Sequence, residues 1–392
     1  MTGTRTYDIV LFGATGFTGE LTAQYLARTA PAGTRWALAG RNPAKLAAVR
    51  DRLAELDPAC KDLPLLHADV SDPGSLAEVA RSARVVITTV GPYVEYGEPL
   101  VAACAEHGTD YVDLSGEPEF VDNMYVRHDE RARETGARIV HCCGFDSIPH
   151  DLGAYFTVQQ LPEGVPLRVE GFVRVDARFS GGTMQSAVGA FGRGPQTIRA
   201  ARARRRATRP PVDRRVRVSV GPSRFAPLGK VVPLPMPGVD PFVVARSAHD
   251  LDRYGPDFTY GHYFAPANPA VAAGTVAGAA ALFALAQLPP ARSLLARLQP
   301  PGTGPSAERR ARSWFNVRFV GEGGGHRVVT EVAGGDPGYD ETAKMLAESA
   351  LCLAYDELPS TSGQVTTAVA MGDALIERLR RAGITFRVLK RT

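Results

Sequence analysis

Seven residues near the N-terminus, Gly13-Ala14-Thr15-Gly16-Phe17-Thr18-Gly19, have the composition of a phosphate-binding turn. They follow a short apolar run at 7–12 that suits a buried strand, and they precede a helix-like stretch at 20–28. In this context the first glycine permits a tight turn, the second lets the backbone approach a pyrophosphate, and the third lets the helix pack on the strand. The alternative is a glycine turn that binds no ligand. We expect the following residues to bind a dinucleotide through backbone N–H groups at the helix N-terminus: Gly13, Thr15, Gly16, Phe17, Thr18 and Gly19.

The residue after the second expected strand indicates which dinucleotide binds. Residues 36–39 read as that strand and lead into Gly40-Arg41-Asn42. A carboxylate at this place would bond the ribose 2′-hydroxyl of NAD, whereas a basic residue accommodates the 2′-phosphate of NADP. Arg41 therefore predicts NADPH as the cofactor, unless it is only a solvated arginine at a loop tip.

The elements that must position these residues form a regular alternation. Further strands are expected at 65–68, 85–90, 111–114 and 139–143, and helix-like segments fill the gaps between them. This alternation predicts a doubly wound parallel sheet of the Rossmann type, in which ligands bind beyond the carboxyl ends of the strands. The further cofactor contacts that we expect there are Asp69, Val70, Gly91, Pro92, Cys143, Gly144 and Phe145.

Several motifs in this region resemble a known family. The stretches 91–97 (GPYVEYG) and 108–117 (GTDYVDLSGE) are similar to those of the saccharopine dehydrogenase-like oxidoreductases. The later motifs 144–149 (GFDSIP) and 180–183 (SGGT) resemble more closely the trans-acting enoyl reductases of mycobacteria and other actinobacteria. The resemblance extends over nearly the whole chain and is strongest over 7–185.

The resemblance implies an NADPH-dependent oxidoreductase with a Rossmann domain and a substrate domain. Trans-acting enoyl reductases reduce a carbon–carbon double bond, acting on CH–CH donors, in acyl chains carried by polyketide synthases. We therefore expect an acyl substrate of polyketide or lipid type, carried by an acyl carrier protein or a synthase. Two alternatives stay open: a saccharopine-type dehydrogenase that acts on an amino-acid imine, and a lipid-associated nucleotide-binding protein without turnover.

Four side chains beyond the strand ends are candidates for catalysis. Reduction of an enoyl thioester needs a group that polarises the carbonyl and a group that protonates the α-carbon. Tyr93 and Tyr96 follow the fourth strand, and a phenol can do both, although either could instead be structural. Glu117 and Asp146 follow the next two strands and could orient a donor, or give a proton if burial raises their pKa. Asp113 reads better as an anchor for neighbouring backbone N–H groups.

The remaining reactive side chains suggest neither a metal site nor a nucleophile. Cys143 is expected to be a small apolar filler. His141 and His150 have no metal-ligand partner at a useful spacing, and His150 beside Asp151 is either a proton relay or an ordinary loop histidine. We therefore expect no bound metal.

Composition sets the wider limits. The chain has 392 residues, 44% hydrophobic and 22% charged, which suits two packed units and excludes a disordered chain. A net charge of +4 is too small to imply nucleic acid as a partner. Five scattered cysteines indicate reduced thiols, and Met1–Arg5 lead straight into a strand without a signal peptide. We expect a cytoplasmic protein, and a homo-oligomer stays open.

The alternation ends after Pro149, which predicts a second domain. Strands are expected at 167–175, 214–220, 314–320 and 327–333, the last two joined by a glycine turn. This pattern indicates an α+β domain with a largely antiparallel sheet. The domain ranges that we expect are 1–150 for NADP binding, 151–355 for substrate, and 356–392 for a segment that returns to the Rossmann domain, the last by resemblance to the family.

Two segments of the second domain have unusual compositions. Residues 193–217 hold ten arginines and one acid, so this stretch is either a solvated surface or a docking surface for an acidic carrier domain. Residues 270–288 hold no charge, but alanine dominates the run. We expect a buried or substrate-lining helix there, with peripheral membrane or lipid contact as the alternative and a true membrane span as the least favoured one.

Overall fold

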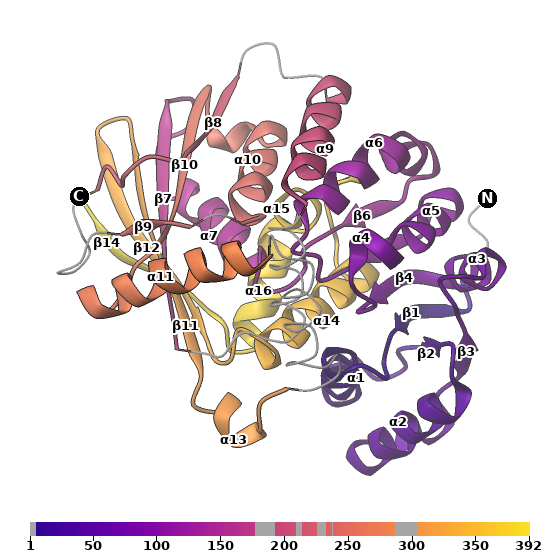
Figure 1. Ribbon diagram of the computed structural model, residues 1–392. Coiled ribbons are helices and arrows are strands. Elements are labelled where there is room, and N and C mark those ends of the chain that lie inside the picture. The colour runs from indigo at the N-terminus through magenta and orange to yellow at the C-terminus, as the bar shows by residue number, and fades with distance from the viewer. Residues whose placement is uncertain (1–4, 177–192, 209–213, 226–232, 237, 287–303) are drawn as a thin grey trace.

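The structure is a computed structural model that describes residues 5–176, 193–208, 214–225, 233–236, 238–286 and 304–392. It contains two seven-stranded sheets. Figure 1 shows them at opposite ends of the molecule, with the helix α14 (Asp340–Tyr355) and the short helix α15 (Thr367–Ala370) in the region between them.

The first sheet is parallel and has the strand order β13-β6-β5-β4-β1-β2-β3. The strand β1 pairs with β2 on one side and with β4 on the other, so the strand order reverses there, as in the Rossmann fold. This confirms the doubly wound parallel sheet. The strands are β1 (Tyr7–Phe12), β2 (Trp36–Gly40), β3 (Leu65–His67), β4 (Ala83–Thr88), β5 (Asp110–Val112), β6 (Arg138–Val140) and β13 (Gly363–Gln364).

Helices cover both faces of this sheet because its strands are apolar on both sides. Ile9 and Leu11 of β1 pack into one core with α1, α2 and α14, whereas Val10 and Phe12 pack into the other with α3, α5 and α6. Several of these helices begin at capping side chains; for example, Asn42 accepts a hydrogen bond from the Lys45 N–H group. The bounds are α1 (Phe17–Thr29), α2 (Pro43–Leu56), α3 (Pro73–Ser82), α4 (Tyr93–Tyr96), α5 (Glu98–His107) and α6 (Pro118–Thr135).

The second sheet has the order β14-β12-β11-β7-β10-β8 and is mixed. The pairs β7–β11, β11–β12 and β12–β14 are antiparallel, while β10 runs parallel to both β7 and β8. The hairpin between β11 and β12 turns at Gly324 and Gly325, which both have positive φ, as such a tight turn requires. The strands are β7 (Leu167–Asp176), β8 (Arg215–Ser219), β9 (Leu234–Pro235, paired with β10), β10 (Asp257–Phe264), β11 (Trp314–Gly323), β12 (His326–Gly334) and β14 (Thr385–Arg391).

Helices join the second sheet to the rest of the chain. The helix α7 (Ile148–Val158) packs on β7, β11 and β12, and α10 (Asp240–Asp250) packs on β8, β10 and α7. A single core cluster thus runs from the α14 face of the first sheet through α7 to the second sheet, and α7 follows β6 in the chain.

The C-terminal part of the chain divides between the two sheets. The strand β13 pairs with β6 of the first sheet, but β14 pairs with β12 of the second. The helix α14 already packs on β1, β4 and β5, so the chain returns to the first sheet before residue 356. The expected boundary at 355/356 therefore needs redrawing. The helix α14 belongs with the first sheet, where it packs with twelve buried side chains. The strand β14 belongs with the second sheet, where it forms the hydrogen bonds of the β12 edge.

The uncharged segment is the helix α11 (Pro269–Ala286), and the expectation of a buried helix is wrong for its described side chains. Val271 and Val276 are exposed, and so is nearly every other described side chain of this helix. Composition predicted burial, but it does not say whether another element covers the helix. Among the described residues no helix is long and apolar enough to cross a membrane.

Candidate active site

The glycine turn has the geometry that phosphate binding requires. Gly13 has φ +97°, and a Cβ atom there would lie 2.7 Å from Thr89 Oγ1. A Cβ at Gly19 would lie 2.2 Å from the Gly13 carbonyl oxygen, so α1 can approach β1 only with glycine at this position. Gly16 has no atom closer than 3.5 Å to such a Cβ, which leaves space where a pyrophosphate would lie. The residues present therefore fit a dinucleotide.

Arg41 lies at the carboxyl end of β2, exposed, beside the loop that follows β3. Asp69 in that loop accepts hydrogen bonds from the N–H group and hydroxyl of Ser71. These bonds, with a smaller contribution from the positive charge of Arg41, hold the pKa of Asp69 below its usual range. Arg41 and Asp69 are thus neighbours at the edge where the adenosine half of a dinucleotide binds.

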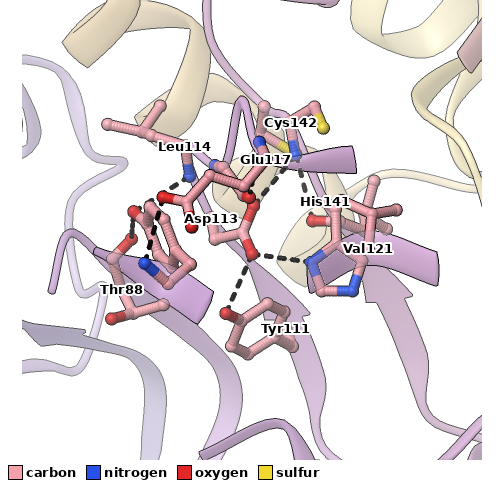
Figure 2. A network of polar contacts seen from close by, with 12 residues as sticks. Thr88, Tyr111, Asp113, Leu114, Glu117, Val121, His141 and Cys142 are labelled. Carbon is pink, nitrogen blue, oxygen red and sulfur yellow. Dashed lines mark hydrogen bonds and ion pairs between the residues drawn. The ribbon is translucent and has the colours of Figure 1, made fainter. Parts of the chain in front are cut away.

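A buried carboxylate, Asp113, connects the ends of β5 and β6 (Figure 2). It accepts hydrogen bonds from the backbone N–H groups of Ser115 at 3.0 Å and Cys142 at 2.9 Å. It also contacts the Tyr111 hydroxyl at 2.9 Å and His141 Nδ1 at 2.6 Å. Asp113 is therefore the anchor that we expected.

The structure places two of the four catalytic candidates in structural roles. The buried Tyr93 hydroxyl donates to the Thr88 carbonyl at 3.1 Å and accepts from the Leu114 N–H group at 3.2 Å. The Glu117 carboxylate accepts from the N–H groups of Tyr93 and Val94 and so caps the short helix α4. We correct the expectation for both residues, because their polar atoms already satisfy the backbone that shapes this edge.

Tyr96 and Asp146 remain as candidates. Tyr96 is 41% exposed at the end of α4, just beyond β4. Asp146 follows β6, where burial raises its pKa to about 6 and a Cβ at Gly116 would lie 3.1 Å from its Oδ2. In the part of the chain that the structure describes, neither side chain forms a hydrogen bond or an ion pair with another residue.

The other expected contacts after β6 line the same loop. The Cys143 thiol is fully buried beside the Val140 carbonyl, and burial raises its pKa well above the usual value, as suits an apolar filler. A Cβ at Gly144 would lie 2.8 Å from Leu114, and the Phe145 N–H group donates to Thr342 Oγ1. Across the sheet the Gly91–Pro92 peptide bond is cis.

Sequence reasoning missed a buried cluster next to this loop. His150, Asp240 and His262 come from α7, α10 and β10, and their polar atoms face one another. Burial lowers the pKa of His262 to about 4, lowers that of His150, and raises that of Asp240. The three residues lie far apart in the sequence, so no spacing could reveal them.

Asp151 does not pair with His150, so the proton relay between these two neighbours is wrong. Its buried carboxylate accepts hydrogen bonds from Ser247 Oγ at 2.5 Å, Thr367 Oγ1 at 2.7 Å and the Ala368 N–H group at 2.9 Å. Asp151 therefore connects α7 to α10 and α15.

Comparisons with known proteins agree with this geometry. The family model of the saccharopine dehydrogenase NADP-binding domain matches residues 9–140. A Mycobacterium tuberculosis (strain H37Rv) protein provisionally named as a trans-acting enoyl reductase is 40% identical over all of this chain and 99% of its own. The trans-acting enoyl reductase of Mycobacterium ulcerans (strain Agy99) is 37% identical over 97% of each chain.

The chain belongs to the trans-acting enoyl reductase family. Among solved structures, apo saccharopine dehydrogenase (L-Glu forming) from Saccharomyces cerevisiae has a TM-score of 0.55 at 12% identity, covering 98% of this chain and all of that one. That likeness shows the fold. The NADP-binding domain, the glycine turn and Arg41 agree, so this member of the family is an NADPH-dependent oxidoreductase.

In this chain the arginine-rich stretch 193–217 is only partly free of ion pairs. Arg193 pairs with Glu119 at 2.7 Å, and the Arg204 guanidinium lies 3.8 Å from the centre of the Tyr125 ring on α6. Arg214 and Arg217 also pair with acids. The exposed arginines without an ion pair to any described residue are Arg199, Arg202, Arg205, Arg206 and Arg215. Arg209 and the motif 180–183 lie outside the described residues.

Proposed function

We propose that this reductase saturates a carbon–carbon double bond conjugated to the thioester of an acyl chain carried by a polyketide synthase or an acyl carrier protein. The similarity over the whole length to enzymes named trans-acting enoyl reductase carries this proposal. When bound, NADPH supplies a hydride to the β-carbon and leaves as NADP⁺. The chain must then bind the cofactor, hold the acyl group beside it and supply one proton to the α-carbon.

Tyr96 is the residue that we propose for the proton. The second half of a doubly wound sheet holds the nicotinamide, and Tyr96 lies directly beyond β4 in that half. Phenols keep their proton at neutral pH, whereas a carboxyl group with a pKa of about 6, such as Asp146, is mostly ionised at pH 7. The phenol is therefore the better donor, and we assign Asp146 to orientation of the acyl group.

The exposed arginines of the helix α9 (Gly194–Ala207) are the proposed docking surface for the carrier. Carrier domains that bear a phosphopantetheine group present negative charge. The positive charge of the exposed arginines attracts such a partner over a Debye length of about 8–10 Å. Arg199, Arg202, Arg205 and Arg206 are the free members on this helix.

A direct assay tests the reaction. Purified enzyme with NADPH and an α,β-unsaturated N-acetylcysteamine thioester should form the saturated thioester. The product should be about 2 Da heavier, because it gains two hydrogen atoms, and one NADPH should be consumed per product. NADPH deuterated at the transferred position should place one deuterium on the β-carbon. A parallel reaction with lysine or another amino acid plus a 2-oxo acid tests the imine alternative. The proposal would be overturned if the enzyme turned over the amino acid and 2-oxo acid but did not reduce the enoyl thioester.

A further inference from the structure

The buried cluster beside the loop after β6 has a feature that the reductase chemistry does not use. His150, Asp240 and His262 are 1%, 6% and 3% exposed. His150 Nε2 lies 3.5 Å from Asp240 Oδ1, and His262 Nε2 lies 3.8 Å from Asp240 Oδ2. One ligand atom from each residue lies within 4.8 Å of the other two.

These separations are too long for good hydrogen bonds among the three residues. His150 Nδ1, Asp240 Oδ1 and His262 Nε2 have no hydrogen-bond partner among the described residues. His150 faces Asp240 through Nε2, so its orphaned Nδ1 does not count as a cluster-facing atom. Buried polar atoms in folded proteins almost always have a partner, so the orphaned Asp240 Oδ1 and His262 Nε2, which do face the cluster, point to something bound there. The Asp113 carboxylate, at the ends of β5 and β6, is by contrast bonded by protein groups, while His141 Nε2 beside it also has no hydrogen-bond partner among the described residues.

We propose that His150, Asp240 and His262 bind a divalent transition-metal ion of the zinc class. Two imidazoles and one carboxylate form a ligand set that such ions prefer, whereas Mg²⁺ and Ca²⁺ prefer oxygen ligands alone. Metal–ligand bonds of about 2.0–2.2 Å place the ligand atoms of a tetrahedral site roughly 3.3 Å apart. The separations of 3.5 and 3.8 Å are to the two different Asp240 oxygens, and the three ligand atoms lie within 4.8 Å of one another, so the side chains must close in by up to about 1.5 Å to bind one ion.

Side chains around the cluster orient one of the histidine rings and cover the other. The Tyr260 hydroxyl lies 3.1 Å from His262 Nδ1, the nitrogen that faces away from the cluster. This partner orients the ring, and when the Tyr260 hydroxyl accepts the Nδ1–H hydrogen bond, His262 Nε2 carries the free electron pair that a metal needs. The Phe145 ring packs edge-on against His150 at 5.5 Å and against Phe315 at 5.0 Å, which excludes water from one side.

The ion would join the two halves of the molecule. His150 begins the helix that leaves the first sheet, whereas Asp240 and His262 belong to elements of the second. Bound metal therefore fixes α7 against α10 and β10, and with it the loop that carries Phe145. Its role is positional, because the ligands are buried and need not touch the substrate.

Metal analysis of the untagged full chain tests this inference without an activity readout. We expect close to one zinc per chain after purification in Zn²⁺, as measured by mass spectrometry of the metal. Chelation should lower Tm, and Zn²⁺ or Co²⁺ should restore it while Mg²⁺ should not. Co²⁺ should also give the visible absorption bands of a tetrahedral site. Less than about a tenth of an ion per chain and no shift in Tm would overturn the proposal.

Variants locate the site within the chain. Asp240→Asn and His262→Gln should each weaken Co²⁺ binding at least 100-fold, and Tyr260→Phe should weaken it about 10- to 100-fold through the lost partner of His262. His249→Gln is the matched control, because His249 and Asp250 form an ion pair at the exposed other end of the same helix. Circular dichroism checks that each variant folds. Co²⁺ binding that survives in both Asp240→Asn and His262→Gln, or that His249→Gln abolishes, would also overturn the proposal. This test does not depend on which substrate the enzyme reduces.

Discussion

Two buried clusters of histidine and aspartate lie close to the end of β6, and they are built in opposite ways. Asp113 accepts four contacts from side chains and backbone N–H groups, so its charge is held by the protein itself. Asp240 lies between two imidazoles, and its Oδ1 has no hydrogen-bond partner among the described residues. Burial alone therefore does not identify a functional cluster. The carboxylate of Asp113 is bonded on both oxygens and builds the scaffold, whereas the unpartnered Oδ1 of Asp240, facing a histidine, supports a bound ligand.

The largest effect should come from removal of the satisfied carboxylate. Asp113→Ala leaves two backbone N–H groups and two side chains without their buried partner, so the free energy of unfolding should fall by about 3–5 kcal/mol. Urea unfolding followed by circular dichroism measures it. In metal-free protein Asp240→Asn should cost under about 1 kcal/mol, because it removes a charge that is costly to bury. Equal costs for the two variants would contradict the comparison.

The same contrast separates the two tyrosines of α4. Tyr96→Phe should lower kcat by roughly 10²-fold with little change in NADPH affinity, because only the proton donor is lost. Tyr93→Phe should instead lower stability, since its hydroxyl bonds Thr88 and Leu114. Steady-state kinetics on the enoyl thioester measures the effect.

Tyr355→Phe is the control for this experiment, because Tyr355 is 40% exposed, as Tyr96 is at 41%. Full activity of Tyr96→Phe would reject the phenol as donor and leave Asp146 for the same test with Asp146→Asn.

Cofactor choice rests on a single exposed cation. Arg41→Ala should reduce the preference for NADPH over NADH by about tenfold or more, because a charge-assisted contact to the 2′-phosphate is lost. Titration of both cofactors against wild type and variant, followed by quenching of protein fluorescence, gives the two affinities. Arg84→Ala, an exposed arginine on β4, controls for loss of charge. Equal affinities for NADPH and NADH in the wild type would show that Arg41 is only solvated.

The free arginines of α9 should have a smaller effect that depends on salt. For a carrier-bound substrate, serine at positions 199, 202, 205 and 206 should lower kcat/KM several-fold at low ionic strength and flatten its salt dependence. On the short free thioester the same variant should behave as wild type. Arg204 is left unchanged because Tyr125 and Asp122 already cover it. A carrier-bound substrate without salt dependence would remove the support for this docking surface.

The smallest effect concerns a half-buried ion pair between Asp356, which follows α14, and Arg378 of the helix α16 (Gly372–Arg381). Burial works to raise the pKa of Asp356, but hydrogen bonds and the charge of Arg378 prevail and lower it below the unfolded value of 3.8. The pair therefore stabilises the fold above about pH 4, and this contribution is lost as the pH falls through the lowered pKa. Arg378→Met should remove well under about 1 kcal/mol at pH 7, and less at pH 3. If Arg378→Met lowered the free energy of unfolding more at pH 3 than at pH 7, the arginine would stabilise the fold through packing and not through its charge.

Much of the nucleotide half could be predicted from the sequence. The order of strand, glycine turn and helix, the two constrained glycines and the basic residue after β2 are local features, and local spacing reports them directly. The parallel sheet followed from alternation, and the glycine hairpin of the second sheet from its turn residues. The return of the chain through α14 and the split of the C-terminal segment between two sheets were not visible, because pairing partners lie hundreds of residues apart.

The site shows the same division. The glycine turn and Arg41 predicted NADPH as the cofactor from the sequence alone, because the features that carry this prediction at Gly13, Gly19 and Arg41 depend on neighbours in the chain. Only the tertiary structure decided that Tyr93 and Glu117 satisfy buried backbone while Tyr96 and Asp146 do not. It also brought together His150, Asp240 and His262, which the chain separates by 90 and 22 residues. Whether a polar group has a partner depends on contacts across the fold, and no spacing along the sequence contains that information.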